Sequence, residues 1–132
     1  MTTRRTFLTT AAALAAASLV SLPAFAQSTS IVSGTFVGKS NHVTSGSVQV
    51  IEEGGRYFVE LGDDFSLDGG PDPRVGFGND GEYDRDAYLG ALLSLTGKQR
   101  YALPSTWSYT KFNEVYIWCE VANVPLGVAS IK

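Results

Sequence analysis

The residue with the clearest capacity for chemistry in this sequence is its single cysteine, Cys119. It ends the densest β-forming run of the chain, which begins at Val115 and contains no Gly or Pro. Because side chains alternate between the two faces of a strand, Cys119 shares a face with Val115 and Ile117, the pattern of a core position. Tyr116 and Trp118 take the opposite face. Two interpretations stay open: a reactive thiol, or a small hydrophobe in the core.

The inventory of other reactive side chains is short. The chain has one cysteine and one histidine, His42, and its only methionine is Met1. A blue-copper site needs two His and a Cys, and iron–sulfur clusters and structural zinc sites need about four ligands. There is no C-x-x-C-H haem motif, no G-x-S-x-G elbow and no visible nucleophile–base set. The sequence therefore favours a module that is not a stand-alone enzyme.

The first 26 residues have the features of an export signal. Residues 3–8 contain the pair Arg4-Arg5 in a twin-arginine context, an Ala/Leu-rich stretch follows, and residues 24–26 have the small-x-small form of a cleavage site. A membrane anchor fits less well, because the apolar run is short and is closed by Pro23. A general-secretion signal that carries two arginines is the stronger rival. We expect cleavage after residue 26 and a periplasmic or secreted protein.

Cleavage would leave residues 27–132, a chain of 106 residues and one domain by length. A domain of this size buries roughly two-thirds of its unfolded surface, enough for a core without disulfides. Eight basic and thirteen acidic residues give it a net charge of about −5. This charge argues against nucleic acid and anionic membranes as partners. No further segment is long enough to span a bilayer, and we expect a monomer.

The pattern of the mature chain is that of short strands. We count eight or nine of them, with 14 glycines and no long helical pattern. The sequence thus predicts an all-β fold, a single small antiparallel β-sandwich or barrel-like domain. The clearest hairpin spans residues 48–61 around the turn Glu53-Gly54-Gly55, with Val48 and Val50 facing the core. Residues 79–86 suggest a charged loop, and residues 89–95 are ambiguous but favour a strand.

Two other groups of side chains suggest no site. Eight acidic residues between positions 63 and 86 could bind calcium, but their spacing does not fit an EF-hand, and a solvated acidic loop is the better interpretation. Trp107, Tyr109 and Phe112 could line a groove, but aromatic loops more often cap the end of a sandwich. We therefore expect these three rings to pack.

A set of short motifs runs through the mature chain in a fixed order. They are Gly34-x-Phe36, His42-x-x-x-Gly46-x-Val48-x-Val50, Asp64-Phe65 through Gly70-Pro71-Asp72, Leu89-Gly90, Gly97 to Pro104, Val115-x-Ile117-Trp118-Cys119 and Leu126-Gly127-x-Ala129. No single motif is specific, but the ordered set resembles the DM thirteen domain family, also described as electron-transfer DM domains. The resemblance covers nearly all of residues 27–132.

The resemblance implies a small β-sandwich that serves in electron transfer or redox modification with a redox partner protein. It implies that Cys119 is the centre, as a bare thiol or as a ligand of a prosthetic group such as haem. His42 would then be a second ligand opposite Cys119; otherwise it is a turn residue that bonds the local backbone. The family's cytochrome-like domains on the same chain are absent here. The alternative function is a non-catalytic exported binding or structural domain with Cys119 in its core.

Overall fold

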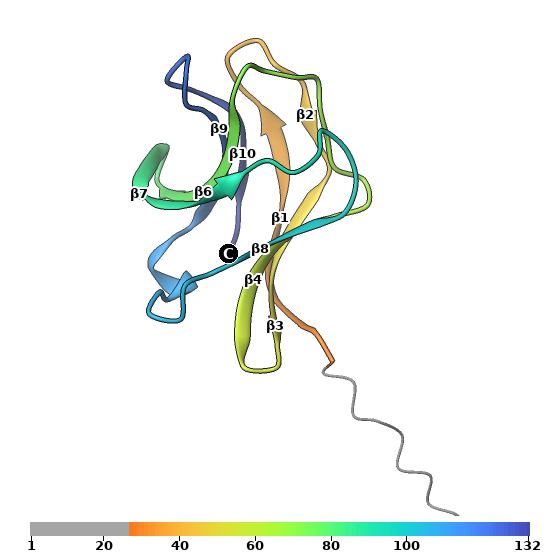
Figure 1. Cartoon of the computed structure of the whole chain (residues 1–132), viewed down its shortest axis with the longest axis vertical. Helices are drawn as coiled ribbons and strands as arrows, with labels where there is room; N and C mark the ends of the chain where they lie inside the picture. Colours follow the sequence, from red (N-terminus) through yellow and green to blue (C-terminus); the bar gives the residue numbers. More distant parts are fainter. Residues whose placement is uncertain (1–26) are drawn as a thin grey trace, which may run out of the picture.

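A computed structural model describes residues 27–132, which fold into antiparallel β-structure (Figure 1). The predicted signal and its cleavage site lie outside these residues. The described elements are β1 (Thr29–Gly38), β2 (Thr44–Ser45), β3 (Ser47–Glu53), β4 (Arg56–Leu61), β5 (Ser66–Leu67), β6 (Pro73–Asn79), β7 (Glu82–Ala91), β8 (Gln99–Ala102), the 3-10 helix η1 (Tyr109–Lys111), β9 (Glu114–Cys119) and β10 (Val124–Ser130). None of the helical structure in residues 27–132 is long and apolar enough to cross a membrane.

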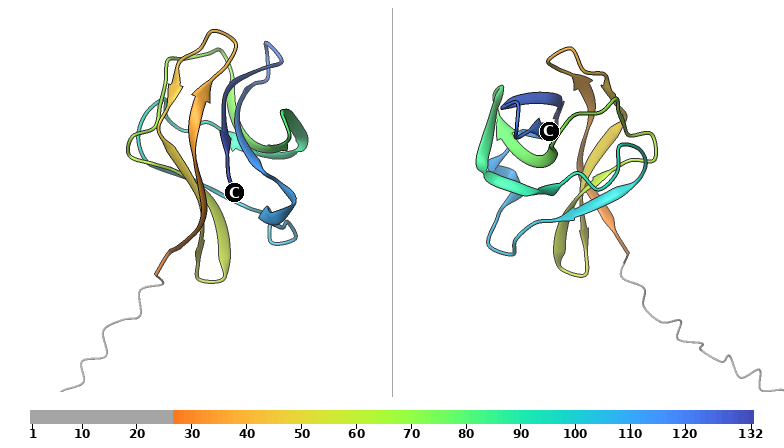
Figure 2. Two further views of the ribbon diagram at one scale, coloured as in Figure 1. Left: turned by 180° about the vertical axis from the view of Figure 1, so that it is seen from behind. Right: turned by 45° about the horizontal axis from the view of Figure 1, so that its top comes forward.

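Eight of the described strands form one sheet in the order β7-β6-β9-β10-β1-β3-β4-β8. The two end strands, β7 and β8, also contact each other, so the sheet curls until it nearly closes (Figure 2). The predicted all-β, barrel-like fold is therefore confirmed. The remaining strands, β2 and β5, are a separate two-residue pair, too short to leave a pattern in the sequence.

The predicted hairpin of residues 48–61 is present as β3 and β4. Val48 is paired with Leu61, and Val50 with Val59. All four side chains are buried in the core, as the alternation predicted. Gly54 and Gly55 make the turn with φ angles of 60° and 80°, which residues with a Cβ rarely adopt.

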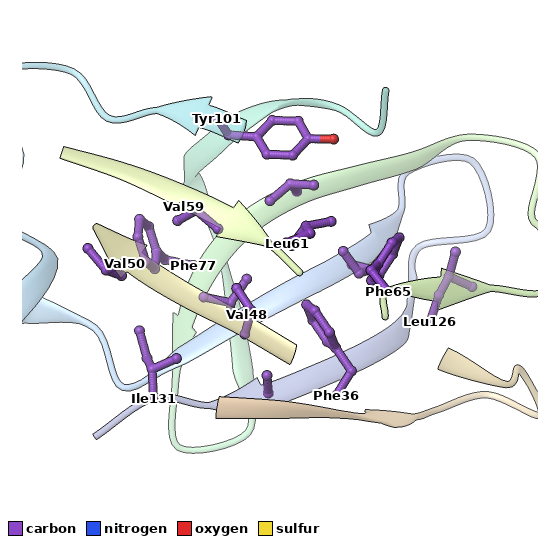
Figure 3. Packing of buried hydrophobic residues seen from close by; sticks show 14 of the residues in the cluster. Phe36, Val48, Val50, Val59, Leu61, Phe65, Phe77, Tyr101, Leu126 and Ile131 are labelled. Carbon is purple, nitrogen blue, oxygen red and sulfur yellow. The ribbon is translucent and has the colours of Figure 1, made fainter. Parts of the chain in front are cut away.

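The inner face of the curled sheet holds a single cluster of buried apolar side chains (Figure 3). Phe36 meets Phe65 edge-on with 5.5 Å between ring centroids. Phe77 stacks on Phe112 at 4.6 Å, and Trp107 and Tyr109 also lie partly buried against the cluster. The aromatic residues around η1 therefore pack against the core, as the sequence suggested.

The segment from residue 79 to residue 86 is not a loop throughout, and that expectation was wrong. Only Asp80 and Gly81 form a turn, with φ angles of 50° and 89°, and β7 begins at Glu82. β7 ends the sheet, and the exposed side of such a strand tolerates charged side chains. The strand predicted in residues 89–95 continues only to Ala91.

Candidate functional site

Cys119 is the last residue of β9, which lies inside the sheet between β6 and β10. Val115, Ile117 and Cys119 are each 0% exposed and belong to the core cluster, so the predicted face is confirmed. The cysteine is free. It is paired with Pro73 on one side and with Val124 on the other.

The surroundings of Cys119 are those of a protected thiol. A reactive thiol is partly exposed and has a cation nearby, and this one is fully enclosed. Two basic side chains that could have activated it are engaged elsewhere: Arg100 Nε lies 2.6 Å from Glu60 Oε2, and Lys98 Nζ lies 3.9 Å from Glu60 Oε1. The structure thus keeps the sulfur out of reach while the sheet is intact.

His42 lies in the connection between β1 and β2. Its Nδ1 is 2.8 Å from Asp68 Oδ1, and the N–H of Val43 donates to Asp68 Oδ2 at 2.9 Å. The hydrogen bond from Val43, followed by that from His42, lowers the pKa of the Asp68 carboxyl below its usual value. These contacts tie the β1–β2 connection to Asp68, directly after β5, and suit a residue that holds a turn in place.

Cys119 and His42 stand at the same end of the sheet but are not brought together. The β1–β2 connection and the β9–β10 turn lie side by side there (Figure 1), and Ser40 Oγ donates a hydrogen bond of 2.6 Å to the carbonyl of Pro125 near the start of β10. However, the sulfur lies in the core, and neither Cys119 nor His42 lines any of five surface pockets found within residues 27–132. Within residues 27–132, no three His, Cys, Asp or Glu side chains are grouped as metal ligands. This arrangement does not fit a haem or a metal held by Cys119.

The outer face of β9 carries a feature that the sequence analysis treated only as the side opposite Cys119. Trp118 stacks on Tyr83 of β7 with 4.5 Å between centroids, and Tyr116 meets Tyr83 edge-on at 5.6 Å. We call Tyr83, Tyr116 and Trp118 the aromatic cluster. The Arg85 guanidinium lies over the Trp118 ring, 5.6 Å from its centroid, and Arg85 Nη1 forms an ion pair with Glu120 Oε1 at 3.0 Å.

Two glycines of β6 make room for the aromatic cluster. A Cβ at Gly76 would lie 2.8 Å from the Tyr83 ring, and a Cβ at Gly78 would lie 2.5 Å from the Tyr116 ring. Both distances are too short for a real contact, so these rings can lie against the strand only because glycine has no side chain. The sequence signal was the alternation of Gly76 and Gly78 with two apolar residues that face the core.

The members of the aromatic cluster differ in what their polar atoms bind. The Tyr116 hydroxyl donates to Glu114 Oε1 at 3.0 Å, although the residue is only 2% exposed. Burial, then this hydrogen bond and the charge of Glu114, raise the pKa of Tyr116. Burial, and then the charge of Glu120, raise the pKa of Tyr83 to about 12. The buried Nε1–H of Trp118 has no hydrogen-bond partner among the described residues.

Residues 35–131 match the family model described as electron transfer DM13. The chain belongs to the DM13 family. The matched region includes Cys119, His42 and the whole aromatic cluster, and the resemblance drawn from the ordered motifs is confirmed. No curated protein sequence and no solved structure gives a significant match. The family description supports a redox or electron-transfer role for this DM13 domain.

Proposed function

We propose that this DM13 domain is an exported electron-transfer module that exchanges electrons with a partner protein through Cys119. The observation that carries the proposal is the family match, which spans the only cysteine of the chain. We favour a bare thiol over a cofactor ligand, because the sulfur is enclosed by apolar side chains and Cys119 lines none of five pockets found within residues 27–132.

Access to Cys119 would come from local opening of the β9–β10 turn, residues 120–123. Few contacts hold this turn: the N–H of Glu120 donates to the Asp72 carbonyl at 3.1 Å, and the N–H of Asn123 donates to the Cys119 carbonyl at 2.8 Å. The ion pair between Arg85 and Glu120 is exposed and contributes at most about 1 kcal/mol. With about 0.5–1.5 kcal/mol for each of the two hydrogen bonds, opening would cost about 1–4 kcal/mol.

The chemistry available to an opened Cys119 is thiol–disulfide exchange. The thiol loses its proton to water, and the thiolate attacks one sulfur of a disulfide on the partner. A bond forms between Cys119 and that sulfur, and the second sulfur leaves as a thiolate with the electron pair. Cys119 is thereby oxidised and the partner disulfide is reduced. The thiolate of a second, small-molecule thiol can then attack the Cys119 sulfur. It takes over the disulfide bond to Cys119, and the partner's remaining sulfur leaves as a thiolate, so the partner ends as a dithiol.

This proposal predicts how a thiol reagent labels the folded protein. Since every 1.4 kcal/mol is a factor of ten in an equilibrium constant, we expect labelling about 5- to 700-fold slower than in the unfolded chain. The rate should change little at low urea concentration, because a local opening exposes little surface. The measurement is the labelling rate of the wild-type protein across a urea series, compared with its equilibrium unfolding curve.

Burial of Cys119 specifically favours the second candidate function, an exported binding or structural domain. In that case the labelling rate would follow global unfolding at all urea concentrations. Labelling would then be slowed by a factor that corresponds to the whole free energy of unfolding, about 5–15 kcal/mol. Cys119→Ala would cost about 1 kcal/mol, and Cys119→Ser would cost more, roughly 1–3 kcal/mol, because it buries a hydroxyl. The redox proposal would be supported instead if the folded wild-type protein exchanges with a small disulfide and both variants do not.

Export is part of the proposal and rests on the twin-arginine pattern of residues 3–8. We expect that replacing Arg4 and Arg5 by Lys traps the precursor in the cytoplasm, because that route reads the arginine pair. The measurement is the fraction of mature protein in the periplasm. Lys keeps the positive charge of the n-region, so an unchanged periplasmic fraction would mean that the general secretion route suffices.

A further inference from the structure

Tyr116 differs in its hydrogen bonding from the other buried tyrosine of the core region. Its hydroxyl donates to a carboxylate, that of Glu114, whereas the Tyr101 hydroxyl donates to the neutral amide oxygen of Gln99 at 2.6 Å. The carboxylate itself is held in place, because the N–H of Gly81 donates to the same Glu114 Oε1 at 2.8 Å. Tyr116 therefore has a fixed proton acceptor within hydrogen-bond distance, and Tyr101 does not.

We propose that Tyr116 is a one-electron redox site whose proton acceptor is Glu114. A phenol becomes a strong acid when it loses an electron, so the electron leaves easily only if the proton has somewhere to go. A one-electron oxidant of high potential, such as a metal centre on a partner, takes one electron from the Tyr116 ring. The phenolic proton moves to Glu114 Oε1, leaving a neutral tyrosyl radical and a carboxylic acid. Reduction by one electron returns the proton.

The other members of the aromatic cluster would pass the electron but not hold the oxidised state. The Trp118 ring lies under the Arg85 guanidinium, whose positive charge disfavours a radical cation, and its Nε1–H has no acceptor within the described residues. The Tyr83 hydroxyl donates no hydrogen bond among the described contacts. The centroid of the Tyr83 ring lies 4.5 Å from that of Trp118 and 5.6 Å from that of Tyr116, so Tyr83 links the Trp118 ring to Tyr116.

The site has two routes to the surface. Tyr116 and Glu114 line a surface pocket of about 220 Å³ together with Lys39 and Pro125, and this pocket would give water a path to the transferred proton. On the other side, Tyr83 lines an open pocket of about 410 Å³. An oxidant docked at either pocket would stand next to the aromatic cluster.

The test is flash oxidation of the purified mature protein with photogenerated ruthenium(III) tris-bipyridine, followed by transient absorption and electron paramagnetic resonance. We expect a tyrosyl radical that Tyr116→Phe removes and that the matched variant Tyr101→Phe leaves in place. Glu114→Gln keeps an oxygen for the Gly81 N–H but cannot take the proton. Since a positioned base contributes a factor of about 10²–10⁴, we expect radical formation to slow about a hundredfold. In wild type the rate should fall in deuterium oxide.

The inference rests on the electron-transfer role proposed above but not on Cys119, so the same flash experiment is run on Cys119→Ala. A radical at Tyr116 in that variant, together with an inert thiol in the labelling experiment, would support Tyr116 as a redox site and exclude Cys119 as one. An unchanged radical yield in folded Tyr116→Phe would overturn the assignment. So would an absent isotope effect in wild type, which requires no variant to fold.

Discussion

Val50→Asp should unfold the domain at neutral pH or lower its melting temperature by more than about 15 °C, since each kcal/mol is worth about 4–8 °C in a domain of this size. Val50 is 0% exposed, in the middle of β3, and is paired with Val59 on β4 and Val32 on β1. A carboxylate there would have to stay charged without a partner or take up a proton. Either choice costs several kcal/mol. The measurement is thermal unfolding followed by circular dichroism.

The matched control for this prediction is Val50→Asn, which has the shape of Asp without its charge. The difference between the two variants isolates the cost of the charge from the cost of lost packing. Because burial raises the pKa of a carboxyl, this difference should be largest at neutral pH and should shrink as the pH falls toward about 4. A Val50→Asp protein that melts at the wild-type temperature would mean that β3 turns its other face to the core.

The β3–β4 hairpin was predictable because its information is local. The alternation of polar and apolar residues from Ser47 to Val50 indicates the buried face, and the turn at Gly54-Gly55 sets the register. The face of Cys119 was predictable for the same reason, since it follows from alternation along β9 alone. What alternation could not provide was the identity of the neighbouring strands.

The aromatic cluster could not be predicted without knowing which strands are neighbours in the sheet. Tyr116 and Tyr83 lie on β9 and β7, which are not adjacent in the sheet, and they meet across the glycines of β6. No local pattern places β7 beside these glycines. The sequence suggests a charged loop only for the first half of this strand, because residues 82–86 carry charges that an end strand can expose to water.

His42 shows a similar limit. Its partner Asp68 is 26 positions away, and their contact depends on the short pair β2–β5, which no periodicity reveals. The sequence therefore left open whether the imidazole is a ligand or a turn residue. The contact with Asp68 explains its position without a second ligand, and the separation of His42 from Cys119 is a property of the folded sheet.

Arg100→Ala should destabilise the protein by about 2–3 kcal/mol, less than the roughly 3–5 kcal/mol lost when one partner leaves a fully buried ion pair, because the Arg100 side chain is 36% exposed. Glu60 is 4% exposed and faces Arg100 at 2.6 Å, while Arg100 also reaches Glu53 at 2.6 Å. Without Arg100, the Glu60 carboxylate keeps only Lys98 and Gln49 as partners. The control Glu53→Gln removes the more exposed of the two pairs and should cost less than about 1 kcal/mol. The measurement is urea unfolding.

The same variant should change how stability depends on pH. Burial alone would raise the pKa of Glu60, but hydrogen bonds from Arg100 and Gln49 and the charges of Lys98 and Arg100 outweigh it, so the pKa is lowered from its usual 4.5. A lowered pKa means that this group stabilises the folded state above the unfolded value and that the contribution is lost as the pH falls through the folded value. The gap between wild type and Arg100→Ala should therefore be widest at neutral pH and close below about pH 4. In the Glu60→Gln background, the loss of stability caused by Arg100→Ala should be smaller at neutral pH. An undiminished loss would mean that Arg100 stabilises the sheet by packing on Phe58 instead of by its charge. The Arg100 guanidinium lies 5.5 Å from the centroid of the Phe58 ring.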